Sequence, residues 1–188
     1  MKLLHLDSSI TGEDSVSRQL TAGIVDHLRA ADPSLEVSYR DLVADPIAHL
    51  TMGLLPAASP DSRAVLDQFL ASDVVVIGAP MYNFTLPSQL KAWLDRILIR
   101  GETFAYGPEG PVGLAAGKRA IIALSRGGVY SGGAPYAQYE HAETYLKAVF
   151  GFIGITPEIV VAEGLAVGPE QRAEAVDSAN ATIDRLAA

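Results

Sequence analysis

Residues 74–84 read Val-Val-Val-Ile-Gly-Ala-Pro-Met-Tyr-Asn-Phe, and this stretch decides the fold class. Four consecutive β-branched residues predict a strand that is buried on both faces, as in a parallel sheet. Pro80 then ends the strand, and Pro87 suits the first turn of a helix that covers residues 89–100. Met81–Phe84 should therefore form an exposed loop at the carboxyl end of a central strand, where open α/β sheets bind ligands.

The side chains of this loop limit its chemistry. Met81–Phe84 carries a thioether, two aromatic groups and a carboxamide, but no nucleophile, histidine or acid. These groups suit a flat, polarisable ring that forms hydrogen bonds better than they suit a hydrolysis site. The alternative is a capping turn with two half-buried aromatic side chains, which in isolation is the commoner case.

The rest of the chain supplies partners for the central strand. Apolar or alternating runs predict five strands, at residues 3–6, 35–40, 73–79, 119–124 and 157–162. Apolar stripes at helical spacing predict five helices, which begin near Ser15, Ser59, Gln89, Tyr136 and Pro169. Right-handed crossovers then require a parallel sheet with helices on both faces. We expect a single α/β domain over residues 1–188, a flavodoxin-like three-layer sandwich with strand order 2-1-3-4-5.

Two of these helices and two connections can be described further. The fourth helix is predicted from about Tyr136 to Phe150. The last helix should turn five apolar residues inward, namely Ala173, Val176, Ala179, Ile183 and Leu186. Residues 41–58 are expected to form an irregular surface connection with at most one helical turn. The Gly- and Pro-rich residues 102–117 should form an extended excursion or hairpin outside the core.

Composition narrows the class of protein. Of the 188 residues, 49% are hydrophobic and 19% charged, which predicts a large core and a sparsely charged surface with apolar area left to bury in an oligomer. The net charge of −8 argues against nucleic-acid binding, which needs a basic surface. The chain has no cysteine, so disulfides and thiol chemistry are excluded.

The sequence contains only weak signals for localisation and for metal binding. No apolar run approaches the ~20 residues that a membrane helix needs, and residues 1–7 turn polar too soon for a signal peptide. We therefore expect a cytoplasmic protein without a membrane partner. The four histidines, at positions 5, 27, 49 and 141, have no metal-ligand spacing, so we expect no metal site.

The loop after the first strand is rich in serine. Ser8, Ser9, Ser15 and Ser17 surround the start of the first predicted helix. Unpaired N–H groups and the helix dipole favour an anion there, and hydroxyl groups add donors, so a phosphate cradle is predicted. Plain helix capping is the alternative. Because both the dinucleotide glycine spacing and the P-loop lysine are missing, a mononucleotide phosphate fits best, such as that of FMN.

The loop after the fourth strand, Ser125-Arg126-Gly127-Gly128, should open at the same edge of the sheet. Two glycines without side chains allow the backbone to lie close to a planar ligand. A simple turn is the alternative reading. Since the negative net charge would repel an anionic nucleotide, Arg126 and Lys118 are candidates for a local positive charge.

Together these segments resemble the FMN-dependent NADH:quinone oxidoreductase/azoreductase family of bacteria. The resemblance extends nearly over the whole chain. It rests on Ser8-Ser9 with Ser15-Val16-Ser17, on residues 79–84 and 125–128, and on Gly151–Thr156 leading to Ala162-Glu163-Gly164. The chain departs from the pattern in the connection after the second strand, which is shorter here than in many members, and in the loop after Gly128.

The resemblance implies a set of ligand-binding residues. The phosphate of FMN would be held by Ser9, Ser15, Val16 and Ser17. The isoalloxazine ring would be held by Met81, Tyr82, Asn83, Phe84, Ser125, Arg126, Gly127 and Gly128. Family members act as homodimers with FMN near the subunit interface. Weaker candidates for the substrate pocket are Phe104, Tyr106 and Tyr130, facing the partner's flavin.

The implied activity is two-electron, ping-pong hydride transfer from NADH or NADPH through flavin N5 to small quinones, with cleavage of aromatic azo compounds in two cycles. No side chain need act as an obligate acid or base, and Asn83 has a supporting role beside the ring. Three alternatives stay open: a flavodoxin-type electron carrier, a flavin reductase that releases its flavin, and a flavin-free binding protein on the same fold.

Overall fold

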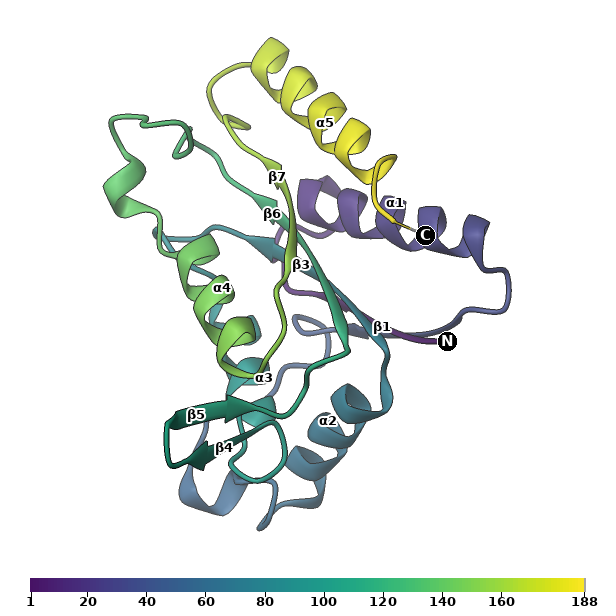
Figure 1. The fold of residues 1–188 in the computed structure, drawn as a ribbon. Helices are drawn as coiled ribbons and strands as arrows, with labels where there is room; N and C mark the ends of the chain where they lie inside the picture. Colours follow the sequence, from purple (N-terminus) through teal and green to yellow (C-terminus); the bar gives the residue numbers. More distant parts are fainter. Residues whose placement is uncertain (188) are drawn as a thin grey trace.

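The computed structural model describes residues 1–187 and is built around one five-stranded sheet (Figure 1). All neighbouring strands are parallel, in the order β2-β1-β3-β6-β7, which confirms the predicted order 2-1-3-4-5. The strands are β1 (Lys2–Asp7), β2 (Glu36–Asp41), β3 (Val74–Pro80), β6 (Arg119–Ser125) and β7 (Glu158–Ala162). All seven residues of β3 are buried, as expected for the centre of a parallel sheet.

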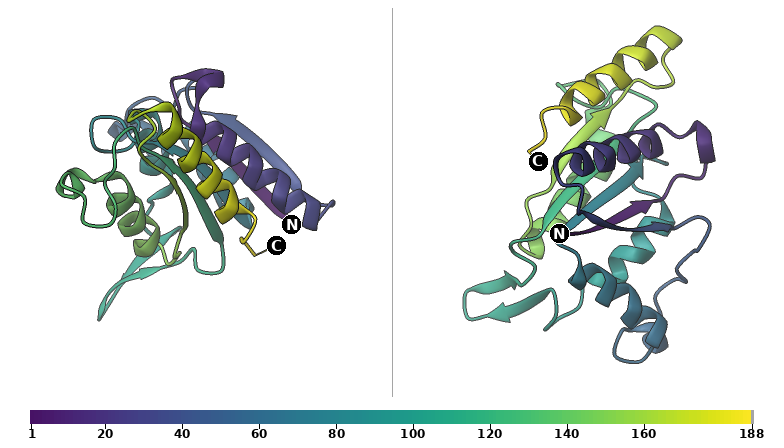
Figure 2. Two further views of the ribbon diagram at one scale, coloured as in Figure 1. Left: turned by 90° about the horizontal axis from the view of Figure 1, so that it is seen from above. Right: turned by 90° about the vertical axis from the view of Figure 1, so that its right-hand side faces the viewer.

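Five helices cover the two faces of the sheet. On one face lie α1 (Val16–Ala31) and α5 (Pro169–Ile183), which Figure 2 shows next to each other. On the other face lie α2 (Pro60–Ala71), α3 (Ser88–Ile97) and α4 (Ala142–Phe152). Three short 3₁₀ turns, Gly12–Asp14, Met52–Leu54 and Ala137–Tyr139, interrupt the connections. No helix among the described residues is long and apolar enough to cross a membrane.

Two hydrophobic clusters follow from the alternation of side chains along the strands. Leu4 and Leu6 of β1 point to the α2, α3 and α4 face, whereas Leu3 points to the α1 and α5 face. Val75 and Val76 of β3 likewise point to opposite faces of the sheet, Val75 to the first and Val76 to the second. Successive residues of a strand face opposite sides, so one apolar run contributes to both clusters. The three-layer arrangement predicted from the sequence is therefore confirmed.

The Gly- and Pro-rich excursion forms an antiparallel hairpin of β4 (Phe104–Gly107) and β5 (Gly110–Gly113). It lies at the amino end of the sheet, where α3 ends and β6 begins (Figure 1). Phe104 packs on Phe152 at the end of α4, with ring centroids 4.7 Å apart. The predicted hairpin is thus confirmed, and the connection 41–58 holds the single helical turn that was expected.

Two predictions about helices were wrong. The fourth helix begins at Ala142 instead of Tyr136, because the carboxylate of Glu140 accepts hydrogen bonds from the N–H groups of Ala142, Glu143 and Thr144 and so caps the helix. In α5, Ala173 is exposed rather than inward. The two buried residues of that helix, Ala179 and Ile183, both lie in its carboxyl-terminal half.

Candidate functional site

The loops after β1, β3 and β6 surround one cavity at the carboxyl edge of the sheet. Its volume is about 440 Å³. The lining residues come from all three loops, from the connection after β7 and from the start of α5: Ser9, Thr11, Asp14, Ser15, Val16, Pro80, Met81, Tyr82, Ser125, Arg126, Gly127, Leu165 and Arg172. The cavity therefore lies beside the switch point between β1 and β3, as the strand order predicts.

Hydroxyl groups gather at the start of α1. Ser15 is the N-cap residue, and its Oγ accepts from the N–H of Arg18 at 3.3 Å and lies 3.1 Å from Ser17 Oγ. Ser9 Oγ lies 3.0 Å from Thr11 Oγ1. Ser8 differs, because its hydroxyl donates to the Gly78 carbonyl inside the sheet. The helix start thus presents hydroxyl groups and dipole to the cavity, which suits an anion.

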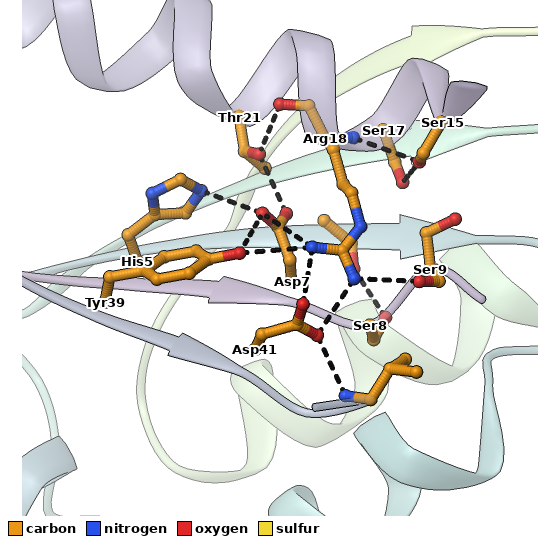
Figure 3. A network of polar contacts seen from close by, with 12 residues as sticks. His5, Asp7, Ser8, Ser9, Ser15, Ser17, Arg18, Thr21, Tyr39 and Asp41 are labelled. Carbon is orange, nitrogen blue, oxygen red and sulfur yellow. Dashed lines mark hydrogen bonds and ion pairs between the residues drawn. The ribbon is translucent and has the colours of Figure 1, made fainter. Parts of the chain in front are cut away.

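Arg18 fixes the backbone of this serine loop (Figure 3). Its Nη2 donates to the Ser9 carbonyl oxygen and to Asp41 Oδ1, both at 2.9 Å. Its Nη1 lies 3.7 Å from Asp7 Oδ2. Two carboxylates therefore neutralise Arg18, and its role is to hold the loop from behind. The hydrogen bond from Arg18 also lowers the pKa of Asp41.

Asp7 is the buried centre of this network. It accepts from Thr21 Oγ1 at 2.9 Å and from Tyr39 OH at 3.1 Å, and His5 Nε2 lies 3.5 Å away (Figure 3). Burial, together with the charge of Asp7, raises the pKa of Tyr39. A Cβ on Gly78 would lie 2.6 Å from Asp7 Oδ1, so glycine is needed there for the carboxylate to fit against β3.

The loop after β3 is a tight, strained turn. Tyr82 and Thr85 exchange both backbone hydrogen bonds, at 2.8 and 3.1 Å. The two residues between them, Asn83 and Phe84, have φ angles of 47° and 72°. Left-handed backbone costs a non-glycine residue roughly 1–2 kcal/mol, and such strain is concentrated at functional sites. Tyr82 OH accepts from the Ile10 N–H at 3.1 Å, which joins this loop to the serine loop.

The loop after β6 is held by its carbonyl groups. The carbonyls of Arg126, Gly127 and Gly128 accept hydrogen bonds from the N–H groups of residues 164–166. The segment after β7 therefore fixes the position of this loop and brings Leu165 to the cavity. Because these carbonyls and the Arg126 N–H are engaged, the loop would contact a ligand through the N–H groups of Gly127 and Gly128, which have no side chain to keep the ligand away.

Arg126 differs from the prediction that it offers a free positive charge. Its side chain is 1% exposed and lies among three carboxylates. Nη2 is 2.5 Å from Glu143 and 3.3 Å from Glu140, and Nη1 is 3.3 Å from Glu163. Arg126 is thus an internal anchor. Lys118, the other candidate, donates to main-chain carbonyls at the amino end of the sheet instead.

The three glutamates keep their negative charge. Burial alone would raise the pKa of each, but hydrogen bonds and the charge of Arg126 outweigh it, so all three pKa values are lowered. Glu163 also accepts from the N–H groups of Tyr130 and Ser131, which fixes the loop after Gly128. This network therefore orders the wall of the cavity.

Eight of the twelve predicted FMN contacts line the cavity, namely Ser9, Ser15, Val16, Met81, Tyr82, Ser125, Arg126 and Gly127. Four do not. Ser17 is buried behind Ser15, Asn83 and Phe84 are exposed at the tip of their turn, and Gly128 is covered by the Tyr130 ring.

The three weaker pocket candidates are separated. Tyr130 lies beside the cavity wall, 3.2 Å from where a Cβ of Gly128 would stand. Phe104 and Tyr106 are in the hairpin at the amino end of the sheet, so they do not reach the cavity of their own chain.

Five lining residues were not among the predicted contacts: Thr11, Asp14, Pro80, Leu165 and Arg172. Arg172, in the first turn of α5, donates to the Asp14 carbonyl at 3.5 Å and is the one cation here that is not enclosed by carboxylates among the described residues. Its only sequence signal was its position near the start of the last helix.

The chain was compared with known proteins. Residues 1–187 match a family described as having a flavodoxin-like fold. The FMN-dependent NADH:quinone oxidoreductase of Gluconacetobacter diazotrophicus is 56% identical, with 99% of both chains covered, and a second such protein, of Bradyrhizobium diazoefficiens, is 60% identical over 95% of both. The chain belongs to the FMN-dependent NADH:quinone oxidoreductase family.

Comparison with solved structures agrees with this family assignment. Azoreductase AzrA superposes with a TM-score of 0.88 and 30% identity, and 99% of this chain and 100% of that chain are covered. An FMN-dependent NADH-azoreductase from Bacillus anthracis, solved in complex with FMN, gives a TM-score of 0.87 at 27% identity, with 97% and 95% covered. In this chain, hydroxyl groups and the start of α1 lie at one end of the cavity, and Met81 and Tyr82 lie at the other.

Proposed function

We propose that this chain binds FMN and uses NADH to reduce quinones, in the manner that the names of its relatives describe. One observation carries the proposal: the hydroxyl-rich start of α1 and the loops after β3 and β6 line one cavity. Bound FMN would supply the chemistry of accepting a hydride and passing on two electrons. The protein's contribution is binding, orientation and electrostatics.

The phosphate end would lie at the start of α1. Ser9 and Ser15 line the cavity there, and Ser17 supports Ser15 from behind. Helix N–H groups and hydroxyls stabilise a phosphate without requiring a lysine. Arg172 is the nearest cation that lines the same cavity. It would offset part of the repulsion that a protein with a net charge of −8 exerts on an anionic ligand.

The ring end would lie between the other two loops. Met81 and Tyr82 offer a polarisable, apolar face. On the opposite side the Arg126 N–H is engaged by the Ala162 carbonyl, so Gly127 would supply the backbone N–H group there. Donors aimed at a ring that becomes more electron-rich on reduction stabilise the reduced form. Asn83 and Phe84 lie at the exposed tip of their turn, so they would meet the ring or the substrate from the open side.

A homodimer and azo reduction complete the proposal. Phe84, Tyr136 and Tyr139 are 48, 63 and 43% exposed and form a chain of neighbouring rings beside the cavity. An aromatic surface of this kind suits burial by a second copy. The hairpin residues Phe104 and Tyr106, remote from their own cavity, would reach the site only from that copy. Aromatic azo compounds are proposed as second substrates because azoreductases share the fold.

The direct test is spectroscopic. Purified protein should show flavin absorbance, lose it on addition of NADH, and recover it on addition of a benzoquinone. A colourless protein that takes up no FMN on titration would leave a flavin-free binding protein. Flavin that NADH does not reduce would indicate an electron carrier, and flavin that dialysis removes readily would indicate a flavin reductase.

Asn83 provides a test at the level of one side chain. Asn83→Ala should lower quinone turnover about tenfold, the value of one hydrogen bond, while FMN stays bound. Asn83→Gly is the matched control, because it also lacks the amide but tolerates a positive φ. Equal loss in both variants assigns the effect to the amide, and unchanged turnover in both removes Asn83 from this role.

A further inference from the structure

A second cavity lies away from the three loops, between the β2–α2 connection, the start of α2 and the side of α3. Its volume is about 380 Å³. It is lined by Arg40, Asp45, Pro46, Ile47, Ala48, Leu54, Asp61, Ser62, Ala64, Val65 and Arg96. None of these residues lines the cavity at the carboxyl edge, so the two sites are separate.

Arg96 is the unusual residue of this second cavity. Its side chain is only 1% exposed. Nε donates to Ser62 Oγ at 2.9 Å and Nη2 donates to the Ala48 carbonyl at 2.7 Å, but Nη1 is buried without a hydrogen-bond partner. Among residues 1–187, no carboxylate lies within ion-pair distance of this guanidinium.

A buried guanidinium group keeps its positive charge. Arginine does not lose its proton in proteins, and a buried charge is expensive unless it is paired. Neutral oxygens of Ser62 and Ala48 satisfy two of the three nitrogens of Arg96 but leave its positive charge uncompensated. An anion at Nη1 would supply both the missing hydrogen bond and the missing charge.

The walls define the kind of anion. Ile47, Leu54 and Val65 give the cavity apolar sides, while one nitrogen of Arg96 is the unused donor. The opening carries acids: Asp45, whose side chain is 77% exposed, and Asp61, also exposed. Asp45 already pairs with Arg40 at 3.3 Å. A phosphate dianion would find few donors, and the two carboxylates would repel it more strongly than they repel a monoanion. A single carboxylate on an apolar body needs only one donor and can use the apolar walls.

We propose that this cavity binds a small organic monocarboxylate, with its carboxylate on Nη1 of Arg96 and its apolar body against Ile47, Leu54 and Val65. The site does not depend on FMN or on the reaction at the other cavity. Nη1 has almost no solvent-accessible surface in this structure, so the β2–α2 connection must shift for the carboxylate to reach it.

Benzoate is a suitable probe, tested by isothermal titration calorimetry on the purified protein saturated with FMN. Binding with a Kd of about 1 mM or tighter is expected from the size of the probe. Neutral benzamide and inorganic phosphate should each bind at least about tenfold more weakly, since they lack the charge or the apolar body. No benzoate binding would mean that water alone satisfies Arg96, and would overturn the proposal.

Two variants locate the binding. Arg96→Met should weaken benzoate binding at least about tenfold. If this variant does not fold, Ala64→Phe decides, because Ala64 is exposed and lines the cavity, so a larger side chain there fills the space while Arg96 itself is kept. Ala30→Phe, at an exposed position of α1, is the matched control and should bind benzoate normally. Benzoate binding that survives Ala64→Phe, or that shifts the flavin absorbance, would place the probe elsewhere and refute the site.

Discussion

Arg126 and Arg96 are equally buried, each with 1% of its surface exposed, yet their surroundings are opposite. Arg126 lies among three carboxylates at the edge of the proposed FMN site. Arg96 has only neutral oxygens as hydrogen-bond partners. Each side chain has one nitrogen without a partner, Nε in Arg126 and Nη1 in Arg96, so the two differ in the charge of their neighbours. A buried cation surrounded by its own carboxylates is a structural anchor, whereas a buried cation without one has unused capacity for an anion.

Arg18 is the intermediate case. It has two carboxylates, Asp7 and Asp41, and it also donates to the Ser9 carbonyl of the serine loop. Two of the three loops at the carboxyl edge, those after β1 and β6, are therefore each fixed by an arginine whose charge is already neutralised. Neither arginine has charge to spare for a ligand, so the proposed phosphate site depends on hydroxyls, the helix start and Arg172.

The largest effect should come from Arg126→Met. The substitution leaves Glu140, Glu143 and Glu163 close together without their shared cation, which we expect to cost about 3–5 kcal/mol of unfolding free energy at pH 7. Urea denaturation measures it. Arg63→Met is the control, because Arg63 is 41% exposed and its ion pairs should contribute about 1 kcal/mol or less. Equal losses in the two variants would contradict the anchor role.

Arg18→Met should have the next largest effect, about 2–3 kcal/mol of stability, because Asp7 and Asp41 would lose their cation. It should also weaken FMN binding about tenfold, since the Ser9 backbone loses its hydrogen bond. Flavin fluorescence titration gives the affinity, and urea denaturation gives the stability. Lower stability with unchanged FMN affinity would show that Arg18 does not position the serine loop.

A smaller effect than these two losses of stability is expected in the pH dependence of the unfolding free energy, which should differ between wild type and Arg126→Met. The lowered pKa values of Glu140, Glu143 and Glu163 contribute stability that is complete above about pH 4.3, the unfolded value, and is lost as the pH falls through the folded values. Wild type should therefore lose more stability than the variant between pH 5 and pH 3. Parallel curves from urea denaturation would show that Arg126 does not set these pKa values.

Arg96→Met should have the smallest effect. Replacing an unpaired buried charge by an apolar side chain of similar length should change the unfolding free energy by about 1 kcal/mol or less in buffer without carboxylates, in either direction. Urea denaturation of Arg96→Met and Arg126→Met under the same conditions tests whether the two buried arginines differ in this way. A loss as large as that of Arg126→Met would mean that Arg96 is also a structural anchor.

Much of the fold could be predicted from short stretches of sequence. The β-branched run 74–77 forms the buried central strand, Ser15 and Ser59 cap their helices, and Pro169 opens the last one. These features depend on neighbours in the chain, so local propensity and side-chain period are enough to predict them. The handedness of parallel connections then predicted helices on both faces of the sheet, and the flavodoxin-like form supplied the strand order.

Hydrogen-bond and ion-pair partners that lie far apart in the sequence could be identified only from the tertiary structure. Arg126 was predicted as a possible free charge, but Glu163, 37 residues away, and two glutamates of the α4 region enclose it. Likewise the cap from Glu140 moved the start of α4, and the hairpin carried Phe104 and Tyr106 away from the cavity of their own chain. The sequence alone determined the strands, the loops at one edge and the chemistry that these loops carry. Which charges are free depends on the packing of segments far apart in the chain, so only the tertiary structure decided it.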